Sequence, residues 1–86
     1  MQKIRVYTTV VCPYCIQAKR LLTSAGLDFE EISVEDNPDL RAKLSADNGG
    51  YRTVPMIFIG DEFIGGFSEL ATLHRQGQLL AKAQRA

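Results

Sequence analysis

The sequence predicts an α/β fold in which a four-stranded mixed sheet is flanked by helices, in the order βαβαββα with a helical tail. Strand-like apolar segments alternate with helical patterns in the first half of the chain, which favours a parallel strand pair. Cys12 with Pro13, and Asn37 with Pro38, are capping residues followed by proline and mark helix starts. The most apolar segment, residues 54–59, is followed by a turn at residues 60–62 and a short partner strand, which predicts an antiparallel hairpin.

Length and charge restrict the class of protein. The 86 residues suit one domain, residues 1–86, with a modest core. Ten basic and ten acidic side chains balance, so the net charge indicates neither nucleic acid nor a membrane surface as a partner. No apolar run approaches the roughly 18 residues of a membrane span, and a strand pattern begins at Ile4, which leaves no room for a secretory signal. With only two cysteines, we expect a reducing, cytoplasmic setting.

The first strand and the helix after it frame the two cysteines. In residues 3–7, Ile4 and Val6 alternate with Tyr7 and two basic residues, which predicts a first strand. Gly26 is expected to close the following helix as a left-handed cap. The apolar stripe of that helix, at three- and four-residue spacing, is Ala18, Leu21, Leu22 and Ala25.

The remaining elements follow from similar patterns. They are a strand at residues 29–34, a helix from Asn37, a strand at residues 54–59, a short strand at residues 63–64, a helix from Ser68 and a fraying helix at residues 78–86. The first two strands should be parallel, because strand–helix–strand crossovers are right-handed. The second helix carries Leu40 and Leu44 on its inner face, and Gly77 separates the last two helices.

Cys12 and Cys15, two residues apart at a helix start, are typical of a redox pair. A helix N-terminus lowers the pKa of a thiol through its dipole and unpaired N–H groups, and Cys12 stands where those groups point. We therefore expect Cys12 to attack and Cys15, one turn further in, to resolve the mixed disulfide. Lys19 and Arg20 follow one to two turns on and would add weak positive potential.

Two other interpretations of the cysteine pair stay open at this point. A permanent disulfide across so short a loop would contribute little stability, because it hardly constrains the unfolded chain. Half of a zinc site would need two further ligands, and beyond this pair only His74 and carboxylates remain. We expect no bound metal.

Three motifs, in this order and spacing, resemble the bacterial dithiol glutaredoxins of the thioredoxin fold. They are Cys-Pro-Tyr-Cys at residues 12–15, Arg-Thr-Val-Pro at residues 52–55 and Gly-Gly at residues 65–66. The resemblance spans Ile4 to about Gly77. It implies a thioredoxin-like fold, thiol–disulfide exchange, and glutathione as reducing co-substrate with no tightly bound cofactor. The implied partners are glutathione and disulfide-containing or glutathionylated proteins, and the chain would be a monomer.

The resemblance also assigns roles to residues of this sequence. Cys12 would become glutathionylated and Cys15 would be the resolving thiol. Pro55 matches the family's cis-proline, which would place the Val54 backbone beside the thiol to pair with the cysteinyl backbone of glutathione like an added strand. The helix start after the Gly-Gly pair would hold the γ-glutamyl end, since free N–H groups favour a carboxylate. The residues expected to contact glutathione are Tyr14, Arg52, Thr53, Val54, Pro55, Gly66, Phe67 and Ser68.

Taken singly, these residues have simpler explanations. Residues 53–55 would suit a strand entry with proline at an unpaired position, and residues 65–66 a plain tight turn. Tyr14 would suit a half-buried aromatic position. Arg52, expected to reach the glycyl carboxylate of glutathione, would also suit a solvated charge. We expect His74 to be a surface or packing residue without a catalytic role.

One position departs from the family pattern. Many relatives carry lysine three residues before the first cysteine, and Thr9 stands there in this chain. The Cys12 thiolate would then depend mainly on the helix terminus, with help from Arg52 or Lys19. We expect the Cys12 pKa to be lowered less than in lysine-bearing relatives, and glutathione to bind more weakly.

The predicted function is that of a glutathione-dependent oxidoreductase, which reduces protein disulfides with both thiols and protein–glutathione mixed disulfides with Cys12 alone. Two other functions stay open. Thr9 leaves room for a thioredoxin-like electron donor reduced by a flavoprotein reductase, whereas Tyr14, Arg52 and the Gly-Gly turn argue against it. An iron–sulfur carrier would bind a cluster between two chains through Cys12 and glutathione. Proline after the first cysteine disfavours it, because cluster-carrying relatives usually have a single cysteine followed by glycine.

Overall fold

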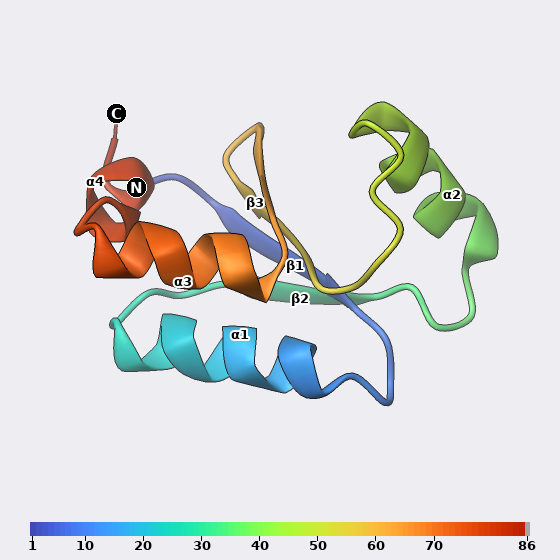
Figure 1. Ribbon diagram of the computed structural model, residues 1–86, viewed down its shortest axis with the longest axis horizontal. Coiled ribbons are helices and arrows are strands. Elements are labelled where there is room, and N and C mark those ends of the chain that lie inside the picture. The colour runs from blue at the N-terminus through green and yellow to red at the C-terminus, as the bar shows by residue number, and fades with distance from the viewer. Residues whose placement is uncertain (86) are drawn as a thin grey trace.

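The computed structural model describes residues 1–85. Its elements are β1 (Ile4–Thr8), α1 (Pro13–Ser24), β2 (Glu30–Ser33), α2 (Pro38–Asp47), β3 (Met56–Ile59), β4 (Glu62–Gly65), α3 (Phe67–Arg75) and α4 (Leu79–Ala83) (Figure 1). This is the predicted order, βαβαββα with a helical tail. None of the helices in this part of the chain has the length and apolar character that crossing a membrane requires.

The four strands form one mixed sheet in the order β2-β1-β3-β4. β1 pairs with β2 in parallel and with β3 antiparallel, and β3 pairs with β4 antiparallel. The parallel pair and the hairpin were both predicted. Because β1 is an inner strand, the loop that leaves it toward the cysteines starts from the middle of the sheet.

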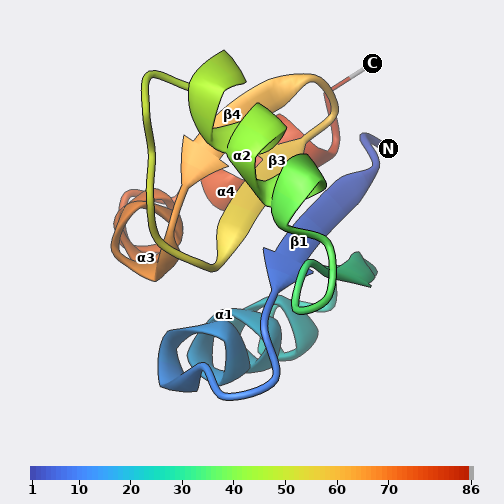
Figure 2. The same ribbon diagram turned by 90° about the vertical axis from the view of Figure 1, so that its right-hand side faces the viewer.

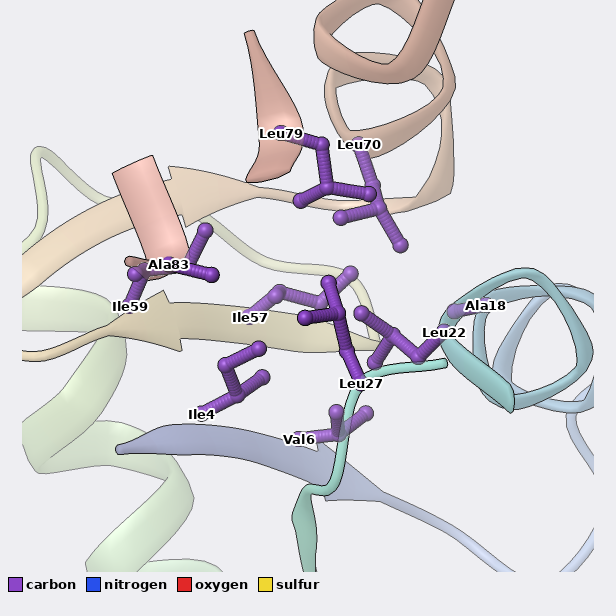
Figure 3. Close-up of a cluster of buried hydrophobic side chains, with 10 residues drawn as sticks. All are labelled: Ile4, Val6, Ala18, Leu22, Leu27, Ile57, Ile59, Leu70, Leu79 and Ala83. Atoms are coloured by element: carbon purple, nitrogen blue, oxygen red, sulfur yellow. The ribbon is translucent and has the colours of Figure 1, made fainter. Parts of the chain in front are cut away.

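Helices cover both faces of this sheet. α1 and α3 lie on one face and α2 on the other (Figure 2). The core of the first face joins residues of α1, α3 and α4 to β1 and β3 (Figure 3). Its buried members are Ile4, Val6, Ala18, Leu22, Leu27, Ile57, Ile59, Leu70, Leu79 and Ala83. A smaller cluster on the second face contains Tyr7, Val34, Met56 and Phe58, and the predicted inner residues of α2, Leu40 and Leu44, pack against it.

The predicted first strand is β1, and it carries buried side chains on both of its faces. Ile4 and Val6 point into the larger core. Tyr7, on the opposite side, is also buried, and its ring meets that of Phe58 edge-on with 5.6 Å between centroids. The second face is covered because β1 lies inside the sheet and α2 packs over it.

Helix α1 has both of its predicted ends. Cys12 is the N-cap in an extended conformation and Pro13 is the first helical residue. Gly26 has a φ of 75°, in the left-handed region where glycine is favoured. Its N–H donates to Thr23 and that of Leu27 donates to Leu22, both at 3.0 Å, which satisfies carbonyls of the last turn.

The strand bounds differ slightly from the predicted ones. β2 spans Glu30–Ser33 rather than residues 29–34, and β3 begins at Met56 rather than residue 54. Pro55 directly precedes β3 and has no N–H to donate to a neighbouring strand. β4 is longer than predicted, because Glu62 and Gly65 also pair with β3.

Helix α3 begins at Phe67, one residue before the predicted Ser68. Glu69 accounts for this start, because its Oε1 accepts a hydrogen bond from the Gly66 N–H at 2.7 Å. A glutamate at the third helical position that reaches back to the N-cap N–H is half of a capping box. Gly66 therefore becomes the N-cap.

The C-terminal helix α4 is docked onto the sheet. Leu79 and Ala83 are buried in the larger core, and Lys82 Nζ lies 3.0 Å from Glu62 Oε2 on β4. The helix at residues 78–86 was expected to fray, but its residues in α4 are docked on the rest of the fold. Residue 86 lies outside the described part of the chain.

Glu31 predicts an acid-dependent contribution to stability. The Lys19 ammonium, and then the Thr8 hydroxyl, hydrogen-bond this carboxylate and hold its pKa below the ordinary 4.5. A pKa that is lower in the folded state stabilises the fold at pH values above 4.5, and the stabilisation is lost as the pH falls through the folded-state pKa. We expect Glu31→Gln to reduce the free energy of unfolding at pH 7 by no more than the ~1 kcal/mol of an exposed ion pair, and by less at pH 3.

Urea unfolding of both proteins at the two pH values measures this effect, with the exposed turn variant Asp61→Asn as the control. A Glu31→Gln penalty as large at pH 3 as at pH 7 would contradict the assignment, because the stabilisation by the ionised carboxylate declines once the pH falls below the ordinary carboxyl pKa of 4.5.

Candidate functional site

The two cysteines form a disulfide at the start of α1. Their Cα atoms are 5.2 Å apart, within the range that a disulfide spans. Cys12 is the N-cap, and its Sγ accepts a hydrogen bond from the Cys15 N–H at 3.1 Å. Cys12 is 7% exposed and Cys15 2%. The N-cap position places the Cys12 sulfur next to an N–H donor of the first helical turn, the arrangement that stabilises a thiolate after reduction.

The segment before β3 lies next to this pair. The Val54–Pro55 peptide bond is cis, as the resemblance implied. Cys12 Sγ lies 3.7 Å from the Val54 carbonyl oxygen. In the oxidised form this is a contact without a proton, because the sulfur is bonded to Cys15. The expectation that the Val54 backbone lies beside Cys12 is confirmed.

A groove of about 280 Å³ runs from the cysteine helix to the start of α3. Its lining contains every residue predicted from the motifs to contact glutathione except Arg52. One wall is Tyr14, whose ring stacks on that of Phe67 with 6.3 Å between centroids. The lining residues are Tyr14, Tyr51, Thr53, Val54, Pro55, Gly66, Phe67, Ser68 and Glu69. Three segments that are far apart in the sequence therefore meet at one surface.

Comparison with known proteins establishes the family. The family model for glutaredoxins matches residues 4–64. A glutaredoxin of Pseudomonas aeruginosa is 48% identical over 79 residues, which cover 92% of this chain and 93% of that protein. The chain belongs to the glutaredoxin family. It is therefore a glutathione-dependent thiol–disulfide oxidoreductase, and Cys12 and Cys15 form its redox-active pair.

Solved glutaredoxins share the fold. The solution structure of the Brucella melitensis glutaredoxin superposes with a TM-score of 0.86 at 38% identity, over all of this chain and 95% of the other. A crystal structure of a buckwheat glutaredoxin–glutathione complex also gives a TM-score of 0.86, at 30% identity, over 95% of this chain and 76% of the other. The predicted thioredoxin-like fold is confirmed.

Two residues that line the groove of this glutaredoxin, Tyr51 and Glu69, were not predicted from its sequence. The Tyr51 hydroxyl donates to Glu69 Oε1 at 3.4 Å, and the same oxygen accepts from the Gly66 N–H. The spacing between Gly66 and Glu69 is that of a capping box and could have indicated Glu69. Nothing in the sequence indicates Tyr51, which reaches the groove by packing on Phe63 with 5.1 Å between ring centroids.

Arg52 and His74 lie outside the groove. Arg52 is exposed, and its carbonyl accepts a hydrogen bond from Arg41 Nη2 at 3.2 Å. His74 is exposed in the last turn of α3. Within residues 1–85, no cluster of three or more histidine, cysteine, aspartate or glutamate side chains is placed to hold a metal ion.

Lys19 is not free to support the active cysteine. Its Nζ lies 3.0 and 3.1 Å from the two carboxylate oxygens of Glu31. An ammonium paired with a carboxylate exerts little net field at a distance. The ion pair with Glu31 therefore argues against the expected contribution of Lys19 to the positive potential at Cys12.

Proposed function

We propose that this glutaredoxin reduces protein disulfides and protein–glutathione mixed disulfides, with Cys12 as the nucleophile and Cys15 as the resolving thiol. The observation that carries the proposal is the groove lined by Val54, whose carbonyl oxygen lies 3.7 Å from the sulfur of the N-cap residue Cys12. We propose further that residues 1–86 act as one domain, as a monomer, in the cytoplasm.

The two thiols would act in sequence. The Cys12 thiolate attacks one sulfur of a target disulfide, forms a mixed disulfide, and releases the other target sulfur as a thiolate. The Cys15 thiolate then attacks the Cys12 sulfur, which frees the target and leaves the Cys12–Cys15 disulfide found here. Two glutathione molecules reduce that disulfide and leave as glutathione disulfide. With a glutathionylated target, Cys12 attacks the glutathione sulfur and Cys15 is not needed.

The groove suits a glutathione tripeptide whose sulfur meets Cys12. The Val54 N–H and C=O would pair with the cysteinyl backbone, as an added strand does. Tyr14 and Thr53 would flank the bound tripeptide, and Pro55 would hold Val54 in place. Arg52 would have to extend from outside the groove to reach the glycyl carboxylate.

The start of α3 suits the γ-glutamyl end, which carries both a carboxylate and an ammonium group. Because the Gly66 N–H already donates to Glu69, the donors for the carboxylate would be the N–H groups of Phe67 and Ser68. The Glu69 carboxylate would accept from the ammonium group. Both charges of the γ-glutamyl end would then have partners at one helix terminus.

Coupled assays decide the reductant. Reduction of a small mixed disulfide is followed with glutathione plus glutathione reductase, and separately with thioredoxin reductase. We expect turnover only with glutathione. Efficient turnover with the flavoprotein thioredoxin reductase alone would contradict the proposed function.

Substitution of Gly66 tests how closely the groove fits the glutathione tripeptide. A Cβ at this position would collide with the Tyr51 hydroxyl and lie 3.5 Å from the Pro55 carbonyl oxygen. We expect Gly66→Ala to raise the KM for glutathione by about tenfold, the scale of one overpacked contact. Tyr51→Phe removes the colliding oxygen, so the double variant should recover part of the loss. Steady-state kinetics of both single variants and the double variant measure this, and an unchanged KM in Gly66→Ala would contradict the binding mode.

With threonine rather than lysine at position 9, we expect the Cys12 thiolate to be less stable than in a Thr9→Lys variant. A lysine at this position would favour the charged form of Cys12, so Thr9→Lys is expected to lower the Cys12 pKa and to strengthen glutathione binding. Titration of the thiolate absorbance in reduced protein, with Cys15 replaced by serine in both proteins, gives the comparison. Equal Cys12 pKa values would show that Thr9 has no such effect.

A further inference from the structure

A carboxylate is hydrogen-bonded to the loop that leads into the reactive cysteine. The Val10 N–H, two residues before Cys12, donates to Glu35 Oε1 at 2.9 Å. Two residues of extended chain span at most about 7 Å. The Glu35 carboxylate therefore lies within roughly 10 Å of the Cys12 backbone, which is about one Debye length at 0.1 M ionic strength.

The strand pairing brings Glu35 to this position. β1 pairs with β2 in parallel as far as Thr8 and Ser33, and the Val34 N–H then donates to the Thr8 carbonyl at 2.8 Å. Val34 is buried in the core of the second face. The segment after β2 and the cysteine loop after β1 therefore leave the sheet side by side, so the contact between Glu35 and Val10 is a consequence of the fold.

The charge of Glu35 is not paired with a cation. Glu30 and Glu31, on the preceding strand, form ion pairs with Lys3 and Lys19. Within residues 1–85, no ion pair includes Glu35. A backbone N–H is a neutral donor, so its hydrogen bond leaves the negative charge of the carboxylate in place. A negative charge close to a thiol disfavours the thiolate, because like charges repel.

Glu35 is the charged side chain that is bound directly to the cysteine loop. Residues 6–18 contain no charged side chain. Lys19 is paired with Glu31, and the Glu69 carboxylate accepts from the Gly66 N–H. The titratable or charged groups of the segments around Cys12 are Tyr14, Lys19, Arg20, Glu35, Asp36, Tyr51, Arg52 and Glu69. Of these, within the described chain, Glu35 is the one whose side chain is hydrogen-bonded to residues 9–12.

We propose that Glu35 is a positioning residue for the redox reaction: its carboxylate, held against the cysteine loop, disfavours the Cys12 thiolate and thereby makes the dithiol a stronger reductant. This inference rests on the proposed function, which takes Cys12 as the nucleophile. Two glutathione thiols reduce the Cys12–Cys15 disulfide and leave as glutathione disulfide. Of their two protons, one stays on Cys15 and the other is released when Cys12 ionises. The thiolate exists only in the reduced form, so a nearby carboxylate raises the free energy of that form and not of the disulfide.

Titration of the Cys12 thiolate absorbance measures the effect directly. The chain has two cysteines, so Cys15→Ser in the parent and in every variant leaves Cys12 as the single thiol. Glu35→Gln keeps an oxygen acceptor for the Val10 N–H and removes the charge. At about 0.01 M ionic strength we expect it to lower the Cys12 pKa by about 0.3 units, the size of one charge at this distance in a largely aqueous surrounding. At about 1 M salt most of the difference should disappear, because the charge is screened.

Two further variants separate charge from structure. Glu35→Ala removes both the charge and the hydrogen bond, and it should shift the Cys12 pKa in the same direction and by a similar amount as Glu35→Gln. Asp61→Asn removes one negative charge from the turn before β4. That turn adjoins the start of β1, where the Gly60 N–H donates to the Lys3 carbonyl, whereas the cysteine loop follows the end of β1. This matched control should leave the Cys12 pKa unchanged.

The redox equilibrium of the protein with both cysteines gives the second readout. Equilibration with glutathione and glutathione disulfide at pH 8 yields the ratio of dithiol to disulfide. We expect Glu35→Gln to shift the equilibrium constant about twofold toward the dithiol, the factor that corresponds to about 0.3 pKa units.

An unchanged Cys12 pKa in Glu35→Gln, or a shift that persists in high salt, would overturn the proposal. So would a shift in Glu35→Ala alone, because it would limit Glu35 to holding the loop. Absence of glutathione-coupled activity in the wild type would overturn the proposed function instead, whereas the titration of Cys12 does not depend on that activity.

Discussion

Replacement of Cys12 by serine is expected to abolish the reduction of both protein disulfides and glutathione mixed disulfides, whereas Cys15→Ser should abolish only the former. Cys12 is the N-cap of α1, with its sulfur next to a first-turn N–H, and it lies beside the Val54 carbonyl. Cys15 is one turn inside the helix and almost fully buried. A serine hydroxyl is not ionised at neutral pH, so the loss at Cys12 should reach several orders of magnitude.

Glutathione-coupled kinetics on one glutathionylated peptide and one peptide with an internal disulfide measure both activities. Circular dichroism of each variant checks that the fold is retained. Substantial activity in Cys12→Ser on either substrate would refute the assigned roles. Equal losses on both substrates in Cys15→Ser would also contradict them, because a glutathionylated target needs only one thiol.

Leu22→Ala is expected to reduce the free energy of unfolding by about 2–5 kcal/mol, the range for removing a buried leucine side chain. Leu22 is fully buried and extends from α1 into the core that contains Ile57 and Leu70 (Figure 3). Small domains are stable by only about 5–15 kcal/mol, so the loss is a large fraction of the total. The same packing fixes α1, and hence Cys12, against the sheet.

Urea unfolding of reduced wild type and variant gives the two free energies at a matched slope. Leu80→Ala is the matched control, because Leu80 is a leucine that is 46% exposed. We expect its cost to stay within about 0.5 kcal/mol, as for other exposed positions. If Leu22→Ala cost no more than Leu80→Ala, the packing of α1 described here would be wrong.

Local signals in the sequence predicted most of the fold. Proline after a capping residue fixed the starts of α1 and α2, and Gly26 marked the end of α1. The same signals placed Cys12 at a helix N-terminus. The resemblance to glutaredoxins, rather than a local signal, implied a cis-proline at residue 55 beside the thiol, and both features are present.

The features that were missed depend on contacts between distant segments. Tyr7 is buried because α2 covers the second face of the sheet, which no pattern within β1 reveals. Tyr51 is held at the groove by its packing on Phe63 and by its hydrogen bond to Glu69, both of which lie far from it along the chain. Lys19 on α1 forms an ion pair with Glu31 on β2. Its positive charge, which was expected to support Cys12, is therefore already neutralised. Such pairings become visible only once the sheet order is known.

The most direct test of the central claim is the site at which glutathione becomes attached. Reduced Cys15→Ser protein is treated with glutathione disulfide and analysed by intact mass and peptide mapping. The arrangement of Cys12 beside Val54 predicts one glutathione per chain, carried by Cys12, and its removal by a second glutathione molecule. A chain that stays unmodified, or that carries glutathione anywhere other than Cys12, would contradict it.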